Sequence, residues 1–331
     1  MRILVTGGAG FIGSNFIRHM MLNHDDLEIV NFDLLTYAGR LENLQDVKND
    51  TRYRFIHGDI RNIKAVNYLM KERFDLIVNF AAETHVDRSL RDGGSFILTN
   101  VHGTHALLDA ARKWDVERFL QISTDEVYGS ITEGSFKETD NLNPSSPYSA
   151  SKAAGDHIAL AFYKTYGCPV LITRSSNNYG PYQYPEKFIP KLILRTLHDQ
   201  PLPIYGNGKQ VRDWLHVTDN CIALDLIVNK GKVGEIYNIA SGEESMNVEV
   251  ARKVLKTLKK TKSLMKTVPD RPGHDFRYSL DTTKIRGLGW KPKINLVKGL
   301  EKTISWYSNN QWWWKNLLKD EFFNMETPHL H

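Results

Sequence analysis

The stretch Thr6-Gly7-Gly8-Ala9-Gly10-Phe11-Ile12-Gly13 decides the fold. It follows a short apolar run, residues 2–6, and opens a helix-length segment, residues 11–23. Its glycines fit G-x-x-G-x-x-G from Gly7 or G-x-G-x-x-G from Gly8. Glycine lets the backbone turn tightly and approach a pyrophosphate, whose charge meets the free N–H groups at the helix start. We therefore expect a dinucleotide site that includes Gly7, Gly10, Phe11, Ile12 and Gly13.

Short apolar runs recur beyond this stretch, with helix-length segments between them. The runs are rich in Val and Ile and do not alternate with polar residues, which is typical of strands buried on both faces of a parallel sheet. The expected strands are 2–6, 27–32, 53–57, 75–80, 117–123 and 169–174, and the expected helices are 11–23, 62–71, 100–113 and 148–166. This alternation predicts an α/β fold with a doubly wound parallel sheet.

Acidic and small residues follow the next expected strands. Asp33 ends the second strand 20 residues after Gly13, where a carboxylate binds the adenosine ribose hydroxyls and repels a 2′-phosphate. NAD is therefore expected rather than NADP. The pairs Asp59-Ile60 and Ala81-Ala82 follow the third and fourth strands, at the edge where ligands bind in open α/β sheets. For Asp59, a capping role fits as well as an adenine contact.

The regular alternation of expected strands and helices ends at residue 174. Residues 177–190 are dense in Asn, Gly, Pro and Tyr, which predicts a structured loop, and residues 269–273 predict another. A strand is expected at 235–240 and an amphipathic helix at 248–258. We expect an NAD-binding Rossmann domain at 1–175, with a return segment at 213–240, and a smaller α/β substrate-binding domain made mainly of 176–331.

Composition limits the class of protein. The chain has 331 residues, 41% hydrophobic and 24% charged, which excludes a small disulfide scaffold, a disordered chain and a fibrous one. Its apolar runs fall far short of the roughly 18 to 20 residues of a membrane span, and the start of the chain leaves no room for a signal peptide. The net charge of +5 comes from scattered residues, so nucleic acid binding is weakly supported and a small anionic ligand explains the sign.

Two cysteines, Cys168 and Cys221, cannot form a zinc site. Both are interpreted as buried thiols in a reduced compartment, which predicts a cytoplasmic protein without a metal.

The expected helix 148–166 begins with Tyr148 and Lys152, which project from one face a turn apart. A lysine ammonium beside a phenol favours the phenolate and makes the tyrosine usable as a base near neutral pH.

The fifth strand ends in Ser123-Thr124-Asp125-Glu126, at the same edge of the sheet. Two neighbouring carboxyl groups suit a division of labour, in which one stays protonated as an acid while the other acts as a base. A simple dehydrogenase needs only the tyrosine. The pair Asp125 and Glu126 therefore implies further chemistry, such as removal of a proton and departure of water. A helix cap made by Thr124 and Asp125 is the alternative.

With these residues the chain resembles the extended short-chain dehydrogenase/reductases, and within them the dTDP-glucose 4,6-dehydratases. The similarity runs nearly end to end, through 7–13, 81–89, 123–129, 148–152, 176–181, 212–214, 270–275 and the tryptophans at 306, 312 and 313. Two departures are small: Thr84 stands where serine is usual, and Ser175 where cysteine is common.

The resemblance implies an NAD-dependent hydro-lyase that converts dTDP-glucose to dTDP-4-keto-6-deoxyglucose and water, in deoxysugar biosynthesis such as that of dTDP-rhamnose. Tyr148, supported by Lys152 and Thr124, would take the proton of the 4-hydroxyl while NAD accepts the hydride from C4. Glu126 would remove the C5 proton and Asp125 would protonate the departing 6-hydroxyl before the hydride returns to C6.

The resemblance also implies a set of contacts to the nucleotide diphosphate sugar. Asn178 and Arg212 would hold the diphosphate, and Thr84, Asp87 and Ser89 the glucose end. The remaining residues of the cleft would be Lys187, Pro203, Tyr205, Asn247, Arg271 and His274.

Helices 100–113 and 148–166 carry small and apolar residues in excess of one buried face. These are Ala106, Leu107, Ala110, Ala153, Ala154, Ile158 and Phe162. The resemblance implies a homodimer formed by these helices through a four-helix bundle.

Several alternatives stay open. A UDP-glucose 4,6-dehydratase differs by one methyl group on the base, and a nucleotide-sugar 4-epimerase or decarboxylase keeps the fold without needing the acid/base pair. A silent NAD-binding regulator would keep the glycines and lose the catalytic residues. The tail 315–331 carries no signal, we expect disorder at 325–331, and the run 312–314 is expected to pack a helix against the second domain.

Overall fold

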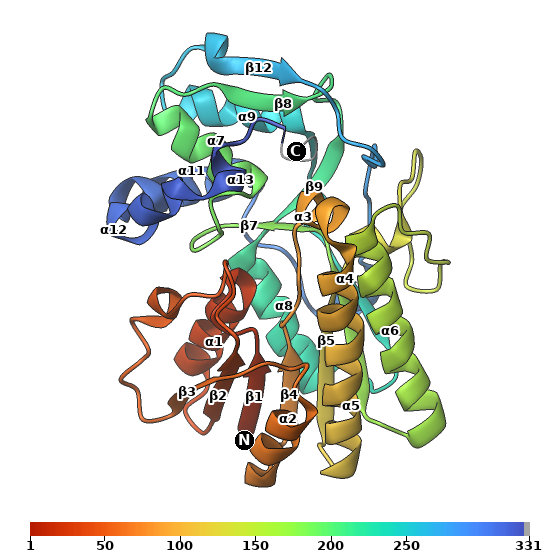
Figure 1. Cartoon of the computed structure of the whole chain (residues 1–331). Coiled ribbons are helices and arrows are strands. Elements are labelled where there is room, and N and C mark those ends of the chain that lie inside the picture. The colour runs from red at the N-terminus through yellow and green to blue at the C-terminus, as the bar shows by residue number, and fades with distance from the viewer. Residues whose placement is uncertain (328–331) are drawn as a thin grey trace.

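The computed structural model describes residues 1–327. Its larger unit is a seven-stranded sheet in the order β10-β6-β5-β4-β1-β2-β3, in which every neighbouring pair is parallel (Figure 1). The strands are β1 (Arg2–Thr6), β2 (Glu28–Asp33), β3 (Tyr53–His57), β4 (Leu76–Asn79), β5 (Arg118–Thr124), β6 (Val170–Ser175) and β10 (Ile236–Ile239). The predicted doubly wound α/β fold is confirmed, and the first six strands lie within one residue of their predicted bounds.

Helices cover both faces of this sheet because its strands are apolar on both sides. The helices are α1 (Phe11–Asn23) and α8 (Val217–Lys230) on one face, and α2 (Ile63–Leu69), α5 (Thr104–Lys113) and α6 (Pro147–Tyr166) on the other. In β1, Ile3 and Val5 belong to the core under α1 and α8, whereas Leu4 belongs to the core under α2 and α5. The chain therefore returns to the first unit through α8 and β10 after it has entered the second unit.

The predicted helix 100–113 begins earlier than expected. The chain passes from α3 (Val86–Arg91) into α4 (Gly93–Phe96) and a π-helical stretch, Ile97–Gly103, which continues into α5. The N-cap of α4 is Asp92, whose carboxylate accepts hydrogen bonds from the N–H groups of Gly94 and Ser95.

The smaller unit combines two short sheets with helices. The sheets are β11-β9-β7 and β12-β8. The elements are β7 (Asn177–Tyr179), α7 (Phe188–Leu197), β8 (Leu202–Tyr205), β9 (Val211–His216), β11 (Glu244–Met246), α9 (Asn247–Thr257), β12 (Met265–Val268), α10 (Thr283–Gly287), α11 (Leu296–Asn309), α12 (Gln311–Trp314) and α13 (Glu321–Asn324).

The prediction of a loop over 177–190 is wrong at both ends. Its first residues form β7, which pairs with β9 from far along the chain. Its last residues open α7, where Pro190 occupies the first helical turn. Proline is tolerated there because the N–H groups of the first turn have no partner within the helix.

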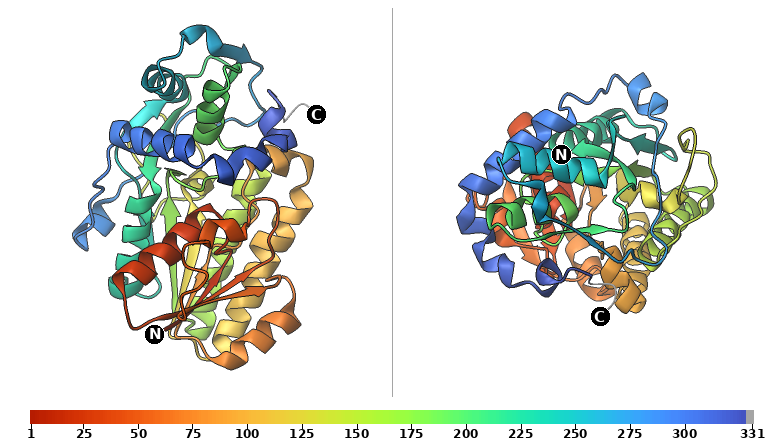
Figure 2. Two further views of the ribbon diagram at one scale, coloured as in Figure 1. Left: turned by 90° about the vertical axis from the view of Figure 1, so that its left-hand side faces the viewer. Right: turned by 90° about the horizontal axis from the view of Figure 1, so that it is seen from above.

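The C-terminal helices lie across the junction of the two units (Figure 2), and Arg91 of α3 donates a hydrogen bond to Glu321 of α13 at 3.2 Å. Trp313 and Trp314 are buried in the core of the second unit, which confirms the predicted packing, while Trp312 is 54% exposed. The expected disorder at 325–331 is wrong for Met325, whose carbonyl accepts a hydrogen bond from Lys191. Residues 328–331 of that segment lie outside the described residues. Within residues 1–327, no helix is long and apolar enough to span a bilayer.

Candidate active site

A cavity of about 340 Å³ lies at the carboxyl ends of the central strands. It brings together every residue predicted for the cofactor and for catalysis. These are Gly7, Gly10, Phe11, Ile12, Gly13, Asp33, Asp59, Ile60, Ala81, Ala82, Thr124, Asp125, Glu126, Tyr148 and Lys152. Of the predicted substrate residues, Thr84, Asn178 and Lys187 line the same cavity.

The glycine loop is closely packed under the cavity. Gly7 has a φ of +69°, and a Cβ there would lie 2.5 Å from the backbone nitrogen of Ala81. A Cβ on Gly13 would lie 2.5 Å from the carbonyl oxygen of Gly7. A side chain at either position would therefore displace backbone, and the start of α1 stays open toward the cavity as a dinucleotide pyrophosphate requires.

Asp33 is held at the end of β2 by backbone donors. Its Oδ2 accepts a hydrogen bond from the N–H of Ala9 at 2.9 Å, and its Oδ1 accepts one from the N–H of Leu35 at 2.8 Å. Burial raises the pKa of Asp33, and these two hydrogen bonds oppose the rise. The carboxylate is thus fixed against the glycine loop.

Trp313 of α12 supports the glycine loop through the side chain of Asn43. Asn43 donates a hydrogen bond from Nδ2 to the carbonyl of Ala9 at 2.7 Å, and its Oδ1 accepts one from the indole N–H of Trp313 at 2.7 Å. Both bonds are buried. The orientation of the Asn43 amide, and through it the carbonyl of Ala9, is therefore set by α12.

Asp59 pairs with Arg61, whose Nη2 lies 2.7 Å from Asp59 Oδ2. The carboxylate also accepts a hydrogen bond from the Arg61 N–H at 2.8 Å, so it shapes the turn after β3. Asp59 lines the cavity, while the cap of α2 is Asn62 and not Asp59.

The start of α6 places Tyr148 and Lys152. Ser146 caps the helix in a reciprocal capping box with Ser149, and Pro147 takes the first helical position. Lys152 reaches across to β5, where its Nζ donates a hydrogen bond to the carbonyl of Ile122 at 2.6 Å. Burial lowers the pKa of Lys152 to about 8.

The expected lowering of the tyrosine pKa is not found. Burial raises the pKa of Tyr148, the negative charge of Glu126 raises it further, and a hydrogen bond with Thr124 lowers it. The lysine ammonium donates to Ile122 instead of lying on the phenol. Tyr148 is therefore a neutral phenol at pH 7 in the protein chain alone.

The carboxyl groups of Asp125 and Glu126 differ in environment. Asp125 is 2% exposed, and burial together with the neighbouring charge of Glu126 raises its pKa well above the usual value. Burial also raises the pKa of Glu126, and the positive charges of Arg271 and Arg212 limit this rise. Of the two carboxyl groups, Asp125 therefore holds its proton more firmly than Glu126, in the direction expected from the sequence.

A second polar cluster adjoins the cavity from the smaller unit. Asp87 accepts a hydrogen bond from the Tyr205 hydroxyl at 3.2 Å and faces Arg271 Nη1 at 3.4 Å. His274 packs edge-on against the Tyr205 ring, and burial lowers its pKa to about 4. The backbone carbonyl of Asp275 holds Arg212 Nη2 at 2.9 Å. These predicted substrate residues do not line the cavity itself, and Arg212 and Arg271 act on Glu126 through their positive charges.

Two other predicted substrate residues, Ser89 and Pro203, do not line the cavity. Ser89 is 1% exposed, and its hydroxyl donates to the carbonyl of Val86 within α3, so the structure does not bring it to the cavity. Pro203 lies on β8 opposite Lys266 of β12, away from the cavity lining. Asn247 does not line the cavity either.

Sequence reasoning missed several lining residues. They are Thr36, Gly39, Arg61, Glu83, Thr99, Ser123, Gln183 and Tyr184. Most of them lie on loops that have no periodic pattern. Only their closeness in sequence to a motif could have predicted them, because Arg61 follows Asp59 and Glu83 follows Ala81-Ala82.

This fold and cavity define an extended short-chain dehydrogenase/reductase, with an NAD site on the first unit and acid/base groups at its edge. The family model described as GDP-mannose 4,6 dehydratase matches residues 4–303. The chain belongs to the nucleotide-sugar 4,6-dehydratases, in the family of the dTDP-glucose 4,6-dehydratases.

Three similar proteins support this assignment. The low-salt glycan biosynthesis protein Agl12 of Haloferax volcanii is 50% identical over 93% of this chain and 98% of its own length. A dTDP-glucose 4,6-dehydratase of Streptomyces niveus is 48% identical over 96% of both chains. The crystal structure of DesIV, a dTDP-glucose 4,6-dehydratase of Streptomyces venezuelae with NAD and TYD bound, has a TM-score of 0.93 and 47% identity, covering 96% of this chain and 100% of that one.

Proposed function

We propose that the protein converts dTDP-glucose to dTDP-4-keto-6-deoxyglucose and water, as an NAD-dependent hydro-lyase of deoxysugar biosynthesis. The observation that carries the proposal is the unequal pair Asp125 and Glu126, placed beside Tyr148 in one cavity. A 4-epimerase of the same class oxidises C4 but eliminates no water, so it has no use for a buried acid next to a base.

NAD fits the residues of this chain. The close packing of Gly7 and Gly13 leaves room for a pyrophosphate at the start of α1, and Asp33 lies where it accepts hydrogen bonds from ribose hydroxyls. Asp59, Ile60, Ala81 and Ala82 line the rest of the cofactor side. When bound, NAD supplies the acceptor for a hydride from C4 and returns it to C6.

Tyr148 serves as the base for the 4-hydroxyl. Its hydroxyl is bonded to Thr124, so the phenol is oriented on the β5 side of the cavity. A buried phenol needs a positive charge to ionise, and the cationic ring of bound NAD would supply one, because the Lys152 ammonium is bonded to the Ile122 carbonyl. The 4-ketone that results acidifies the C5 hydrogen.

Glu126 and Asp125 then carry out the elimination. Glu126, whose negative charge Arg212 and Arg271 favour, takes the C5 proton, and the C5–H electron pair forms the C5–C6 double bond. Asp125, kept protonated by burial, gives its proton to the departing 6-hydroxyl, which leaves as water. When the hydride returns to C6, Glu126 returns a proton to C5.

The nucleotide sugar extends toward the smaller unit. Asn178 and Arg212 bind the diphosphate, since a guanidinium presents paired donors to phosphate oxygens. Thr84, Asp87 and Lys187 lie near the glucose, and Tyr205, Asn247, Arg271 and His274 form the outer cleft.

The test is to incubate the purified protein with dTDP-glucose and, separately, with UDP-glucose, without added reductant, and to follow product mass. We expect loss of one water from the dTDP sugar. Equal turnover of both would leave the base preference unassigned, and conversion to the galactose isomer without a mass change would contradict the proposal.

We expect NAD affinity to decrease as the pH rises through 8. The pKa of Lys152 is lowered to about 8, so its ammonium is present below that pH and lost above it. If the ammonium binds the NAD ribose, affinity falls by up to about tenfold per pH unit above 8. The measurement is NAD binding by cofactor-stripped protein across this range.

Lys191 is the control for this titration, because its pKa is also lowered to about 8 although it lies outside the cavity. Lys152→Met should remove the pH step and Lys191→Met should keep it. A step that persists in Lys152→Met would assign the titration to another group.

We also propose a cytoplasmic homodimer. Among the residues predicted for the four-helix bundle, Ala106, Leu107, Ala110, Ala153 and Phe162 are buried within the chain itself, so they do not explain a partner. The support comes from Ile97 and Leu98, which precede α5 and are 58% and 51% exposed, and from the partly exposed Ala154 and Ile158 on α6. A sedimentation mass of one chain at micromolar concentration would contradict the dimer.

The proposed cytoplasmic location is supported by Cys168 and Cys221, which are both buried and form no disulfide.

A further inference from the structure

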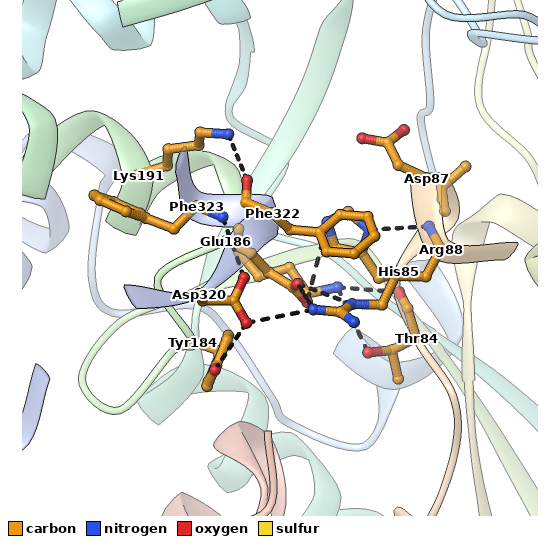
Figure 3. A network of polar contacts seen from close by, with 12 residues as sticks. Thr84, His85, Asp87, Arg88, Tyr184, Glu186, Lys191, Asp320, Phe322 and Phe323 are labelled. Atoms are coloured by element: carbon orange, nitrogen blue, oxygen red, sulfur yellow. Dashed lines mark hydrogen bonds and ion pairs between the residues drawn. The ribbon is translucent and has the colours of Figure 1, made fainter. Parts of the chain in front are cut away.

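Arg88 joins the two segments that carry the sugar-side residues, although it does not line the cavity. Its Nε and Nη2 donate hydrogen bonds to Glu186 Oε2 at 3.0 and 2.8 Å (Figure 3). Arg88 follows Asp87 in α3, and Glu186 precedes Lys187. Lys187 Nζ in turn donates to the carbonyl of Thr84 at 3.1 Å. One ion pair therefore fixes the spacing between Thr84 and Asp87 on one side and Lys187 on the other.

The guanidinium of Arg88 contacts two aromatic rings. Its Cζ is 3.9 Å from the ring centroid of Tyr37, in the loop after β2, and 3.9 Å from that of Phe322, in α13. The partner carboxylate of Glu186 is completely buried. The two rings flank a guanidinium that bonds Glu186 and also faces Asp320 Oδ2 at 3.5 Å, while the Arg88 side chain itself stays 24% exposed.

Phe322 belongs to a segment that we name the C-terminal clasp, residues 320–326. Two cationic side chains of α7 bind its backbone. Lys191 donates to the carbonyls of Phe322 and Met325 at 2.8 and 2.6 Å, and Arg195 donates to those of Phe323 and Asn324 at 3.1 and 2.8 Å. These carbonyls end a short helix and have no partner within it. The clasp is thus anchored on the helix that directly follows Glu186 and Lys187.

Stability alone does not explain such a pair. A buried ion pair contributes little net stability, because the cost of removing two charges from water offsets their attraction. What the pair supplies is fixed geometry, since a guanidinium with two bonds and two ring contacts has one position.

We propose that Arg88 is a positioning residue for the hexose of the substrate, and that the C-terminal clasp holds Arg88 on Glu186 so that Thr84, Asp87 and Lys187 keep their spacing around the sugar. The inference rests on the proposed function for the identity of the sugar. It assigns to the C-terminal clasp a part in substrate recognition.

The test variant is Arg88→Lys, which keeps the charge but loses the planar guanidinium and its paired donors. A displacement of about 1 Å in a positioning group lowers activity by roughly 100-fold, so we expect kcat/KM for dTDP-glucose to fall about 100-fold, chiefly through KM. The amount of bound NAD should stay unchanged. The matched control is Arg2→Lys: Arg2 also pairs with a glutamate, Glu72, at 2.8 Å and faces an aromatic ring, Phe74, but it lies at the opposite end of the sheet.

Phe322→Leu provides a second variant, which leaves Arg88 and Glu186 in the chain. It should raise KM in the same direction, and its effect should not add to that of Arg88→Lys in the double variant. The proposal is overturned if Arg88→Lys lowers thermal stability without changing KM, which is the result that the control Arg2→Lys permits. It is also overturned if the effects of Arg88→Lys and Phe322→Leu on KM add independently.

Amide hydrogen exchange separates this inference from the proposed function. In Arg88→Lys, exchange in segments 84–91 and 184–191 should increase together, whatever the substrate. Failure of the wild-type protein to act on dTDP-glucose would reject the proposed function. Unchanged exchange in either segment would reject the coupling through Arg88.

Discussion

Tyr148→Phe is expected to lower kcat by roughly 10²- to 10⁴-fold, the contribution of a positioned acid/base group. The substitution removes only the hydroxyl, and the ring still packs edge-on against Phe96 at 6.2 Å. Because this hydroxyl is the group proposed to take the proton of the 4-hydroxyl, oxidation at C4 fails, and every later step fails with it. Turnover of dTDP-glucose, bound NAD and the melting temperature are the measurements.

The control for this variant is Tyr166→Phe, in the last turn of the same helix. Tyr166 is 56% exposed and lies outside the cavity, so its loss should leave turnover unchanged. Undiminished activity of Tyr148→Phe would assign the base to another group. A loss of NAD in this variant would point to a role in cofactor binding instead.

Glu126→Gln is expected to abolish the elimination while leaving NAD bound. An amide has the shape of the carboxylate but cannot take the C5 proton, so we expect water loss to slow by roughly 10²- to 10⁴-fold. In deuterium oxide, the wild-type product should carry solvent deuterium at C5, because Glu126 exchanges its proton before returning it. The variant should show neither water loss nor deuterium at C5 in recovered sugar.

Glu133→Gln is the matched control, since Glu133 is exposed in the loop that follows the same strand. It should behave as the wild-type protein does. Deuterium at C5 in Glu126→Gln at the wild-type rate would show that another base removes this proton.

The Rossmann unit was predictable because its signals are local. A strand buried on both faces needs a continuous apolar run, so β1 to β6 are visible as segments of sequence. The glycine loop, Asp33, the Asp125-Glu126 pair and Tyr148 follow such strands or open such helices. Their meeting in one cavity is a consequence of parallel strands that end at the same edge.

The second unit was less predictable because its contacts are distant in sequence. Arg212, Tyr205 and Arg271 come from separate loops and strands, and only the family resemblance pointed to them. Pro190 concealed the start of α7, since proline in a first turn looks the same in sequence as proline in a loop. Arg88 and Glu186 are 98 residues apart, and no periodic pattern connects them.

The indole of Trp313 has a consequence for how the protein is made. During synthesis the first strands leave the ribosome early, and N-terminal regions generally begin to fold first. Asn43, which fixes the carbonyl of Ala9, nonetheless takes its orientation from a residue 270 positions later. The glycine loop is therefore among the first segments translated and among the last to gain all its supporting contacts. A nascent chain in which Trp313 has not yet been translated lacks this support. Tight binding of NAD is therefore reached only late in translation.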